Sequence, residues 1–236
     1  MPEPLLDVRE LRAGYGSLVV VRDVSFQVDK GATTLILGLN GAGKTTTLKT
    51  IAGILQPLGG KIGFNGNDIT SWPPHLRARE GLVMITDNPI FPDMSVTDNI
   101  MLASSPAHYR SPKEALAEAF TYFPDLAKLA RLRASALSGG QRKMLAMAMA
   151  MVSRPKLLLL DEPSTGLSPV MVSKVVSYVD QLKRMGITIL LAEQNPSFIG
   201  VADYVMVMET GRLKLYGTAE EIGKAEEVRR TFFQVT

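Results

Sequence analysis

Residues 38–45 have the residue types and the order of a phosphate-binding loop. They read Gly-Leu-Asn-Gly-Ala-Gly-Lys-Thr and match the pattern G-x-x-x-x-G-K-[ST]. Glycines let the backbone curl until its N–H groups converge on phosphate oxygens, and the positive end of a following helix adds attraction. Lys44 supplies a charge for the β- and γ-phosphates, and the Thr45 hydroxyl can ligate Mg²⁺. The pattern predicts binding of ATP or another nucleoside triphosphate with Mg²⁺, the simpler alternative being a glycine-rich turn without a ligand. The residues expected around the phosphates are Gly38, Leu39, Asn40, Gly41, Ala42, Gly43, Lys44, Thr45 and Thr46.

Two carboxylates, Asp161 and Glu162, directly follow the apolar run of residues 157–160. The carboxyl ends of strands in an open α/β sheet are where ligands bind. There Asp161 could hold a Mg²⁺ ion, and Glu162 could accept a proton from an attacking water or orient that water. Acidic residues also end strands as solvated caps, so the pair indicates hydrolysis only together with the phosphate loop.

A second candidate anion site lies at residues 137–141, which read Leu-Ser-Gly-Gly-Gln before a predicted helix. A serine hydroxyl and two glycines that expose N–H groups suit an anion at a helix N-terminus. Because one chain already carries one phosphate loop, a second site is useful if it serves a different nucleotide. The residues proposed for this contact are Ser138, Gly139, Gly140 and Gln141.

The elements that must position these residues follow from hydrophobic periodicity. Residues 24–28 alternate like a half-buried strand, and residues 33–37 form a denser apolar run that ends at Gly38. Apolar runs return at 157–160, 187–192 and 204–208, with a helical pattern over 170–184. Strand–helix alternation predicts a mostly parallel α/β sheet. Residues 88–152 are instead rich in helix formers, which predicts an inserted helical lobe.

Composition excludes several classes of protein. The chain has 236 residues, no cysteine and a formal net charge of +3, and 46% of its residues are hydrophobic. A disulfide framework is therefore excluded, and the charge is too small to indicate nucleic acid. No signal peptide is visible, and no apolar stretch approaches the roughly 18–20 residues of a membrane-spanning helix. We expect any link to a membrane to be made through a partner.

The order of these motifs resembles the ABC ATPase family. Lys44 and Ser138 are 94 positions apart, and Ser138 and Asp161 are 23 positions apart. The resemblance implies a single ABC ATPase domain over residues 1–236, with a RecA-like P-loop NTPase core and an N-terminal antiparallel β subdomain. The core would comprise residues 1–87 and 153–236, and the helical subdomain residues 88–152. It also implies that two subunits pair head to tail, each placing its residues 137–141 on the γ-phosphate held by the other.

Other family positions are carried over one at a time. Tyr15 matches the aromatic residue that stacks on adenine, although a surface tyrosine in a turn is the alternative. Gln194 occupies the catalytic switch position that most members fill with histidine, and glutamine can still donate to a γ-phosphate oxygen. Residues 164–169 match the loop between subunits, with Ser168 near the place of its usual aspartate.

One departure concerns the loop where the family has a glutamine that reaches Mg²⁺ and the water. Counting forward from Gly81 places this position at Asp87, and counting back from Phe91 and Pro92 places it at Thr86. Asp87 could bind Mg²⁺ directly or through water, or it could be a solvated loop acid.

The finer resemblance is to the smaller ATPase subunit of branched-chain amino acid importers. The segments that carry it are residues 11–16, 41–48, 153–160, 161–169, 192–195 and 209–212. It implies a second ATPase subunit, identical or distinct, two transmembrane permease subunits and, indirectly, an extracytoplasmic binding protein. The chain would lie peripherally on the cytoplasmic face of the plasma membrane and bind no nucleic acid. Two alternatives stay open: a soluble ABC ATPase without a transport role, and a subunit that binds ATP while its partner hydrolyses it.

Overall fold

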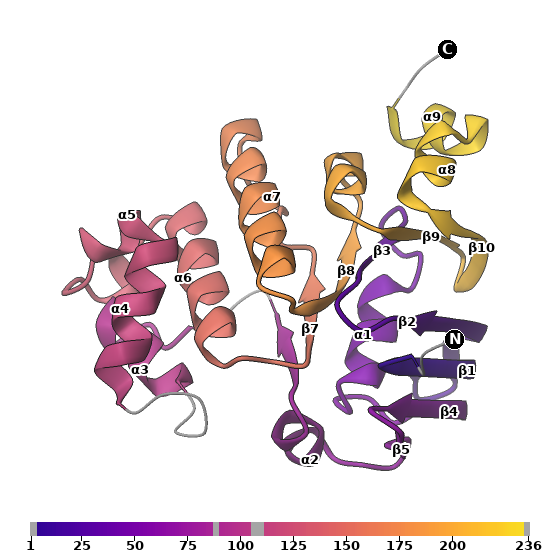
Figure 1. Cartoon of the computed structure of the whole chain (residues 1–236). Coiled ribbons are helices and arrows are strands. Elements are labelled where there is room, and N and C mark those ends of the chain that lie inside the picture. The colour runs from indigo at the N-terminus through magenta and orange to yellow at the C-terminus, as the bar shows by residue number, and fades with distance from the viewer. Residues whose placement is uncertain (1–3, 87–89, 105–110, 234–236) are drawn as a thin grey trace.

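The computed structural model describes residues 4–86, 90–104 and 111–233. Its larger sheet has six strands in the order β10-β9-β3-β8-β7-β6 (Figure 1). Strands β9, β3, β8, β7 and β6 are parallel, and β10 is antiparallel to β9. The bounds are β3 (Thr33–Leu37), β6 (Leu82–Ile85), β7 (Leu157–Asp161), β8 (Thr188–Glu193), β9 (Tyr204–Glu209) and β10 (Arg212–Thr218).

Both faces of this sheet are covered, which explains why its central strands are continuously apolar. Alternate residues of β7 belong to two different hydrophobic clusters: Leu158 and Leu160 to one, Leu157 and Leu159 to the other. Parallel strands that are buried on both faces have this sequence character. Because β3, β7 and β8 are parallel, their carboxyl ends meet at one edge of the sheet.

A second sheet of four antiparallel strands, in the order β2-β1-β4-β5, contains the N-terminal part of the chain. Helix α1 (Lys44–Ile51) lies between the two sheets, and its Leu48 and Ile51 share one cluster with Val8 and Leu159. The predicted N-terminal antiparallel subdomain is thus confirmed. Its strands are β1 (Leu6–Tyr15), β2 (Leu18–Val28), β4 (Gly59–Phe64) and β5 (Asn67–Asp68).

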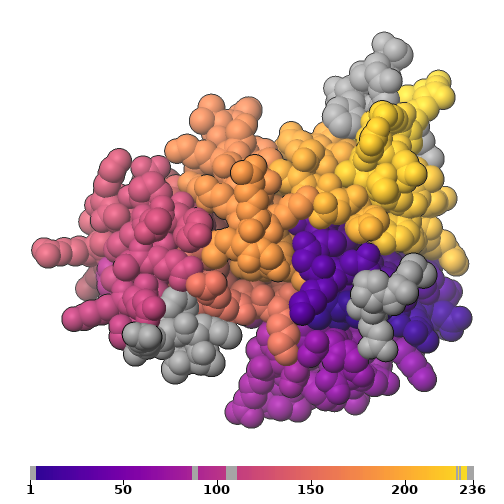
Figure 2. Space-filling view, viewed as in Figure 1, coloured from indigo at the N-terminus to yellow at the C-terminus, as the bar shows by residue number. Residues whose placement is uncertain are grey.

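The helices of the middle of the chain pack together at one side of the molecule, as predicted, and α7 (Pro169–Arg184) lies between them and the core (Figures 1 and 2). The helices of this side are α3 (Val96–Ala103), α4 (Pro112–Tyr122), α5 (Pro124–Ala127), the 3₁₀ turn η1 (Ala134–Ala136) and α6 (Gly139–Val152). The core carries α2 (Pro74–Arg79), the 3₁₀ helix η2 (Pro196–Val201), α8 (Ala219–Lys224) and α9 (Glu226–Phe233). The division at residues 87/88 and 152/153 stays a proposal.

A buried arginine fixes the far end of α1. The Arg77 guanidinium is fully buried and donates to the carbonyl oxygens of Thr50, Ile51, Trp72 and Thr70 at 2.8–3.0 Å. Burial lowers the pKa of Arg77 to about 10. The bonds to Thr50 and Ile51 satisfy carbonyls at the negative, C-terminal end of α1. Because α1 begins at the phosphate loop, Arg77 anchors the helix that holds the loop.

Candidate nucleotide-binding site

The phosphate loop, residues 38–45, joins β3 to α1, as the sequence predicts. Gly41 and Gly43 have φ values of 82° and 103°, which lie in the left-handed region that favours glycine. At Gly38 a Cβ atom would lie 2.6 Å from the carbonyl oxygen of Met208 on the neighbouring strand. The glycines are therefore required by backbone conformation and by a close approach of two strands.

Lys44 places its ammonium among three oxygen atoms. Its Nζ donates to the carbonyl oxygens of Gly38 and Leu39 at 2.9 and 3.2 Å and pairs with Oε1 of Glu162 at 3.0 Å. Only 3% of the lysine side chain is exposed. Burying an ammonium is costly unless it is paired and hydrogen-bonded, and here the phosphate loop and Glu162 supply those partners.

Thr45 and Asp161 meet beside this charge. The Thr45 hydroxyl donates to Oδ1 of Asp161 at 2.9 Å across 116 positions of sequence. A hydroxyl and a carboxylate are oxygen ligands of the kind that Mg²⁺ prefers, and that ion usually takes few protein ligands plus substrate phosphates. In the described part of the chain no group of three His, Cys, Asp or Glu residues could form a metal site by itself. The donor set fits a Mg²⁺ ion shared with a nucleotide.

Glu162 stands just beyond β7 in a strained conformation. Its φ of 45° is uncommon for a residue with a side chain. The backbone N–H donates to the carbonyl oxygen of Ala192 at 2.9 Å, and the Thr165 hydroxyl donates to Oε2 at 3.2 Å. A quarter of the side chain is exposed. The carboxylate is thus held at the phosphate loop while it remains open to water.

A small cavity of about 120 Å³ lies against the loop. Its lining combines Val20 of β2, the loop residues from Gly41 to Thr46, and Glu162. Tyr15 ends β1 at the hairpin that leads into β2, and about half of its side chain is exposed. An exposed aromatic face at this position is available to a flat ligand.

The predicted second anion site forms the N-terminus of α6. Ser138 caps the helix: its Oγ accepts from the Gln141 N–H at 3.3 Å, and the Ser138 N–H donates to Oε1 of Gln141 at 2.9 Å. A Cβ at Gly140 would lie 2.4 Å from Cε of Met171, whereas one at Gly139 would meet no atom of the residues that the structure describes within 4 Å. The cavity at the phosphate loop includes none of residues 138–141. The structure therefore keeps this segment outside the chain's own phosphate site.

Gln194 follows β8, next to a residue that the sequence did not single out. Glu193 is only 2% exposed, and its carboxylate accepts from the backbone N–H groups of Ser164, Gln194 and Asn195 at 2.8–3.2 Å. Gln194 itself is exposed. The signal in the sequence was an acidic residue that closes an otherwise apolar strand.

The loop in which a glutamine was expected follows β6. Thr86 is half-buried just beyond Ile85, at the same sheet edge as Asp161, because β6 and β7 are parallel neighbours. Asp87 lies outside the described residues, so its predicted metal contact stays a prediction.

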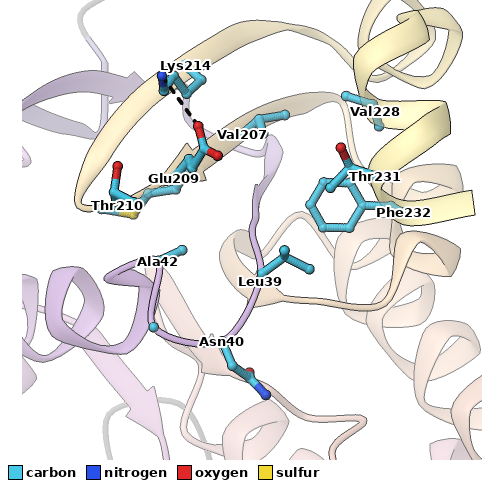
Figure 3. A pocket seen from close by; sticks show the side chains of 12 residues that line it. Leu39, Asn40, Ala42, Val207, Glu209, Thr210, Lys214, Val228, Thr231 and Phe232 are labelled. Atoms are coloured by element: carbon cyan, nitrogen blue, oxygen red, sulfur yellow. Dashed lines mark ion pairs between the residues drawn. The ribbon is translucent and has the colours of Figure 1, made fainter.

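A larger cavity, of about 250 Å³, lies on another side of the phosphate loop (Figure 3). Leu39 of the loop faces Thr231 and Phe232 of α9 across it, and Lys214 pairs with Glu209 at 3.3 Å on its rim. The C-terminal helix thus packs beside the loop, which the sequence did not predict.

The fold and the site define an ATP-hydrolysing cassette. Residues 21–165 match the model of the family described as ABC transporter, and the chain belongs to this family. It is an ATP-binding subunit with ATP hydrolase activity.

Individual relatives refine the comparison. A probable branched-chain amino acid transport ATP-binding protein, LivF, of Archaeoglobus fulgidus is 35% identical, with 96% of this chain and 97% of that one covered. The high-affinity branched-chain amino acid transport ATP-binding protein BraG of Pseudomonas aeruginosa is 31% identical, covering 97% and 99%. The lipopolysaccharide export system ATP-binding protein LptB of Acidithiobacillus ferridurans is 34% identical, covering 97% and 96%.

The fold agrees with a solved structure. An ATP-binding cassette of an ABC transporter, MJ1267, superposes with a TM-score of 0.83 at 28% identity and covers 97% of each chain. The predicted α/β cassette architecture and the resemblance to importer ATPases are both confirmed.

Proposed function

We propose that this chain powers the import of branched-chain amino acids, or of related amides or urea, by binding and hydrolysing ATP. The observation that carries the ATPase role is the convergence of Lys44, Thr45, Asp161 and Glu162 from distant parts of the chain at one phosphate loop. The names of the LivF and BraG relatives favour the amino acid substrate. LptB, which is of similar identity, favours an export role as the second candidate.

The site residues divide the work. Lys44 and the loop N–H groups bind the phosphates, Tyr15 stacks on adenine, and Gln194 donates to the γ-phosphate. Thr45 and Asp161 hold the Mg²⁺ ion, with Asp87 as a further proposed ligand, and the ion neutralises phosphate charge when bound. Glu162 accepts a proton from the attacking water or orients it. Because Lys44 pairs with Glu162 at 3.0 Å, a phosphate that attracts the ammonium competes with the carboxylate and frees it for water.

A second ATPase subunit completes the site in this proposal. The support comes from Gly139, which exposes the N-terminus of α6 and has open space around its missing side chain. Among the described residues nothing within 4 Å requires glycine there, and the open space leaves room for a close approach by another molecule. Residues 138–141 would bind the nucleotide of a partner that is turned head to tail.

The proposed location is the cytoplasmic face of the plasma membrane, where two permease subunits hold the chain and an extracytoplasmic binding protein delivers substrate. Among the described residues, no helix combines the length and the apolar character that crossing a membrane requires. A soluble ABC ATPase, or a subunit that only binds ATP, is the alternative.

Two measurements test the proposal. The purified full chain should release phosphate from ATP with Mg²⁺, and Lys44→Ala should abolish the release. Co-expressed with the two permease subunits and the binding protein of the proposed importer, the chain should drive leucine into vesicles when ATP is supplied on its side. ATP turnover without leucine uptake would overturn branched-chain amino acids as the substrate, and no turnover in either preparation would overturn the hydrolytic role.

A further inference from the structure

The Glu193 side chain is a buried carboxylate to which the proposed ATP chemistry assigns no role. It is the only carboxylate among the described residues whose side chain is almost completely buried. Taking a carboxylate out of water is costly unless hydrogen bonds replace the lost hydration. Here three backbone N–H groups replace it, and no basic side chain shares in the described contacts of the carboxylate. A leucine or a valine would fill a strand end without this cost.

The three bonds divide between two loops. Oε1 accepts from the N–H of Ser164, in the loop between β7 and α7, at 2.8 Å. Oε2 accepts from the N–H groups of Gln194 and Asn195, in the loop after β8, at 3.0 and 3.2 Å. One rigid side chain therefore sets the separation of the two loops.

The backbone of the same residue reaches a third loop. The carbonyl oxygen of Glu193 accepts from the N–H of Gly38, the first residue of the phosphate loop, at 3.2 Å. The preceding residue, Ala192, accepts from the N–H of Glu162 at 2.9 Å. The end of β8 is thus bonded to the phosphate loop, to the position of the proposed base and to both flanking loops.

We propose that Glu193 is a positioning residue for hydrolysis, which ties Gln194 to the loop of residues 163–168 so that a displacement of one loop moves the other. The inference rests on the proposed function, since it assigns Glu193 to the same ATP site. Residues 163–168 lie beside Glu162 and continue into α7, so contact of another molecule with this loop would be transmitted to Gln194 through one carboxylate.

Glu193→Gln is the informative variant. An amide offers one acceptor oxygen and one NH₂ group, and the NH₂ group cannot accept from a backbone N–H. One of the two loops must therefore lose its bond, while the size of the side chain is unchanged. Glu220→Gln on the exposed surface of α8 makes the same chemical change away from the site, and is the matched control.

We expect Glu193→Gln to lower kcat on the order of tenfold or more, because a small misplacement of catalytic groups has such effects. KM for ATP should stay near the values of the wild type and of Glu220→Gln, and the melting temperature should fall by only a few degrees, because one buried hydrogen bond is lost. Hydrogen exchange of Ser164, or of Gln194 and Asn195, should accelerate, while the β7 amides stay protected. An unchanged kcat, or parallel losses of kcat, ATP affinity and melting temperature, would overturn the positioning role.

A measurement on the wild-type chain keeps the test independent of the variant and of turnover. If the carboxylate couples the loops, the amides of Ser164, Gln194 and Asn195 open with one common free energy and gain protection together when ATP binds. Distinct opening free energies would refute the coupling. Absence of phosphate release by the wild type would contradict the proposed function alone, because hydrogen exchange reports on the loops without hydrolysis.

Discussion

At the scale of single residues, the site is organised by competition for one ammonium group. Lys44 is bonded to two loop carbonyls and to Glu162. A nucleotide phosphate can bind the Lys44 ammonium only by displacing one of these three oxygens. Glu162 is the partner with access to water. Binding of ATP and release of the proposed base are therefore two consequences of one exchange of partners.

Glu162→Gln should leave ATP binding intact and slow hydrolysis roughly 100-fold or more, as loss of a general base does. The amide cannot take a proton, and it holds Lys44 less strongly than a carboxylate does, so ATP affinity should not fall. Phosphate release measures the loss of hydrolysis and equilibrium nucleotide binding measures the retained ATP affinity, with Glu220→Gln as control. Wild-type turnover in this variant would remove Glu162 from the mechanism.

Gly139→Ala should separate folding from function. A Cβ at this position meets no atom of the described residues within 4 Å, and alanine is a better helix former than glycine by about 1 kcal/mol in helix interiors. Thermal stability should therefore be maintained, while ATP turnover falls because the methyl group blocks the partner's nucleotide. Gly200→Ala, which also enters open space, should change neither. A Gly139→Ala protein with normal turnover would argue against an approach by a second subunit at α6.

At the scale of elements, helix α1 transmits stability to the phosphate loop. The loop forms its N-terminal end, and Arg77 binds the carbonyls of Thr50 and Ile51 at its C-terminal end. We expect Arg77→Met to lower the free energy of unfolding by about 3 kcal/mol, since buried carbonyls lose charged donors. Arg79→Met changes an exposed arginine of the same short helix and should cost little. Denaturant titration compares the two, and equal stability of both variants would contradict the anchoring role.

At the scale of the whole molecule, the exposed N-terminus of α6 predicts a nucleotide-dependent dimer. The Glu162→Gln chain, which holds ATP without hydrolysing it, should double its mass from 25.6 kDa when ATP and Mg²⁺ are present. ADP should return it to a monomer, because ADP lacks the γ-phosphate that is proposed to bridge the two chains. Light scattering after size exclusion measures both states. An obligate heterodimer would instead stay monomeric until its distinct partner is added.

Local patterns predicted the central strands and the long helix α7 with little error. Residues 33–37 coincide with β3, the run at 157–160 lies within β7, and the pattern at 170–184 lies within α7. These elements are strongly apolar or strongly periodic, so neighbouring residues carry their signal. Strand β6 and helix α9 were not predicted, because short or weakly apolar segments acquire their structure from packing against distant elements.

The sequence by itself indicated the family, which the match to the ABC transporter family confirms, and it predicted the roles of the phosphate loop, the acidic pair and the α6 N-terminus. Spacing and residue type suffice for these, because each motif works through its own backbone and neighbours. Only the tertiary structure decided that Thr45 meets Asp161 and that Lys44 meets Glu162. It also revealed Glu193, whose partner at Ser164 is 29 positions away. Such contacts depend on which strands are neighbours in the sheet, and strand order is a property of the folded chain that no local pattern contains.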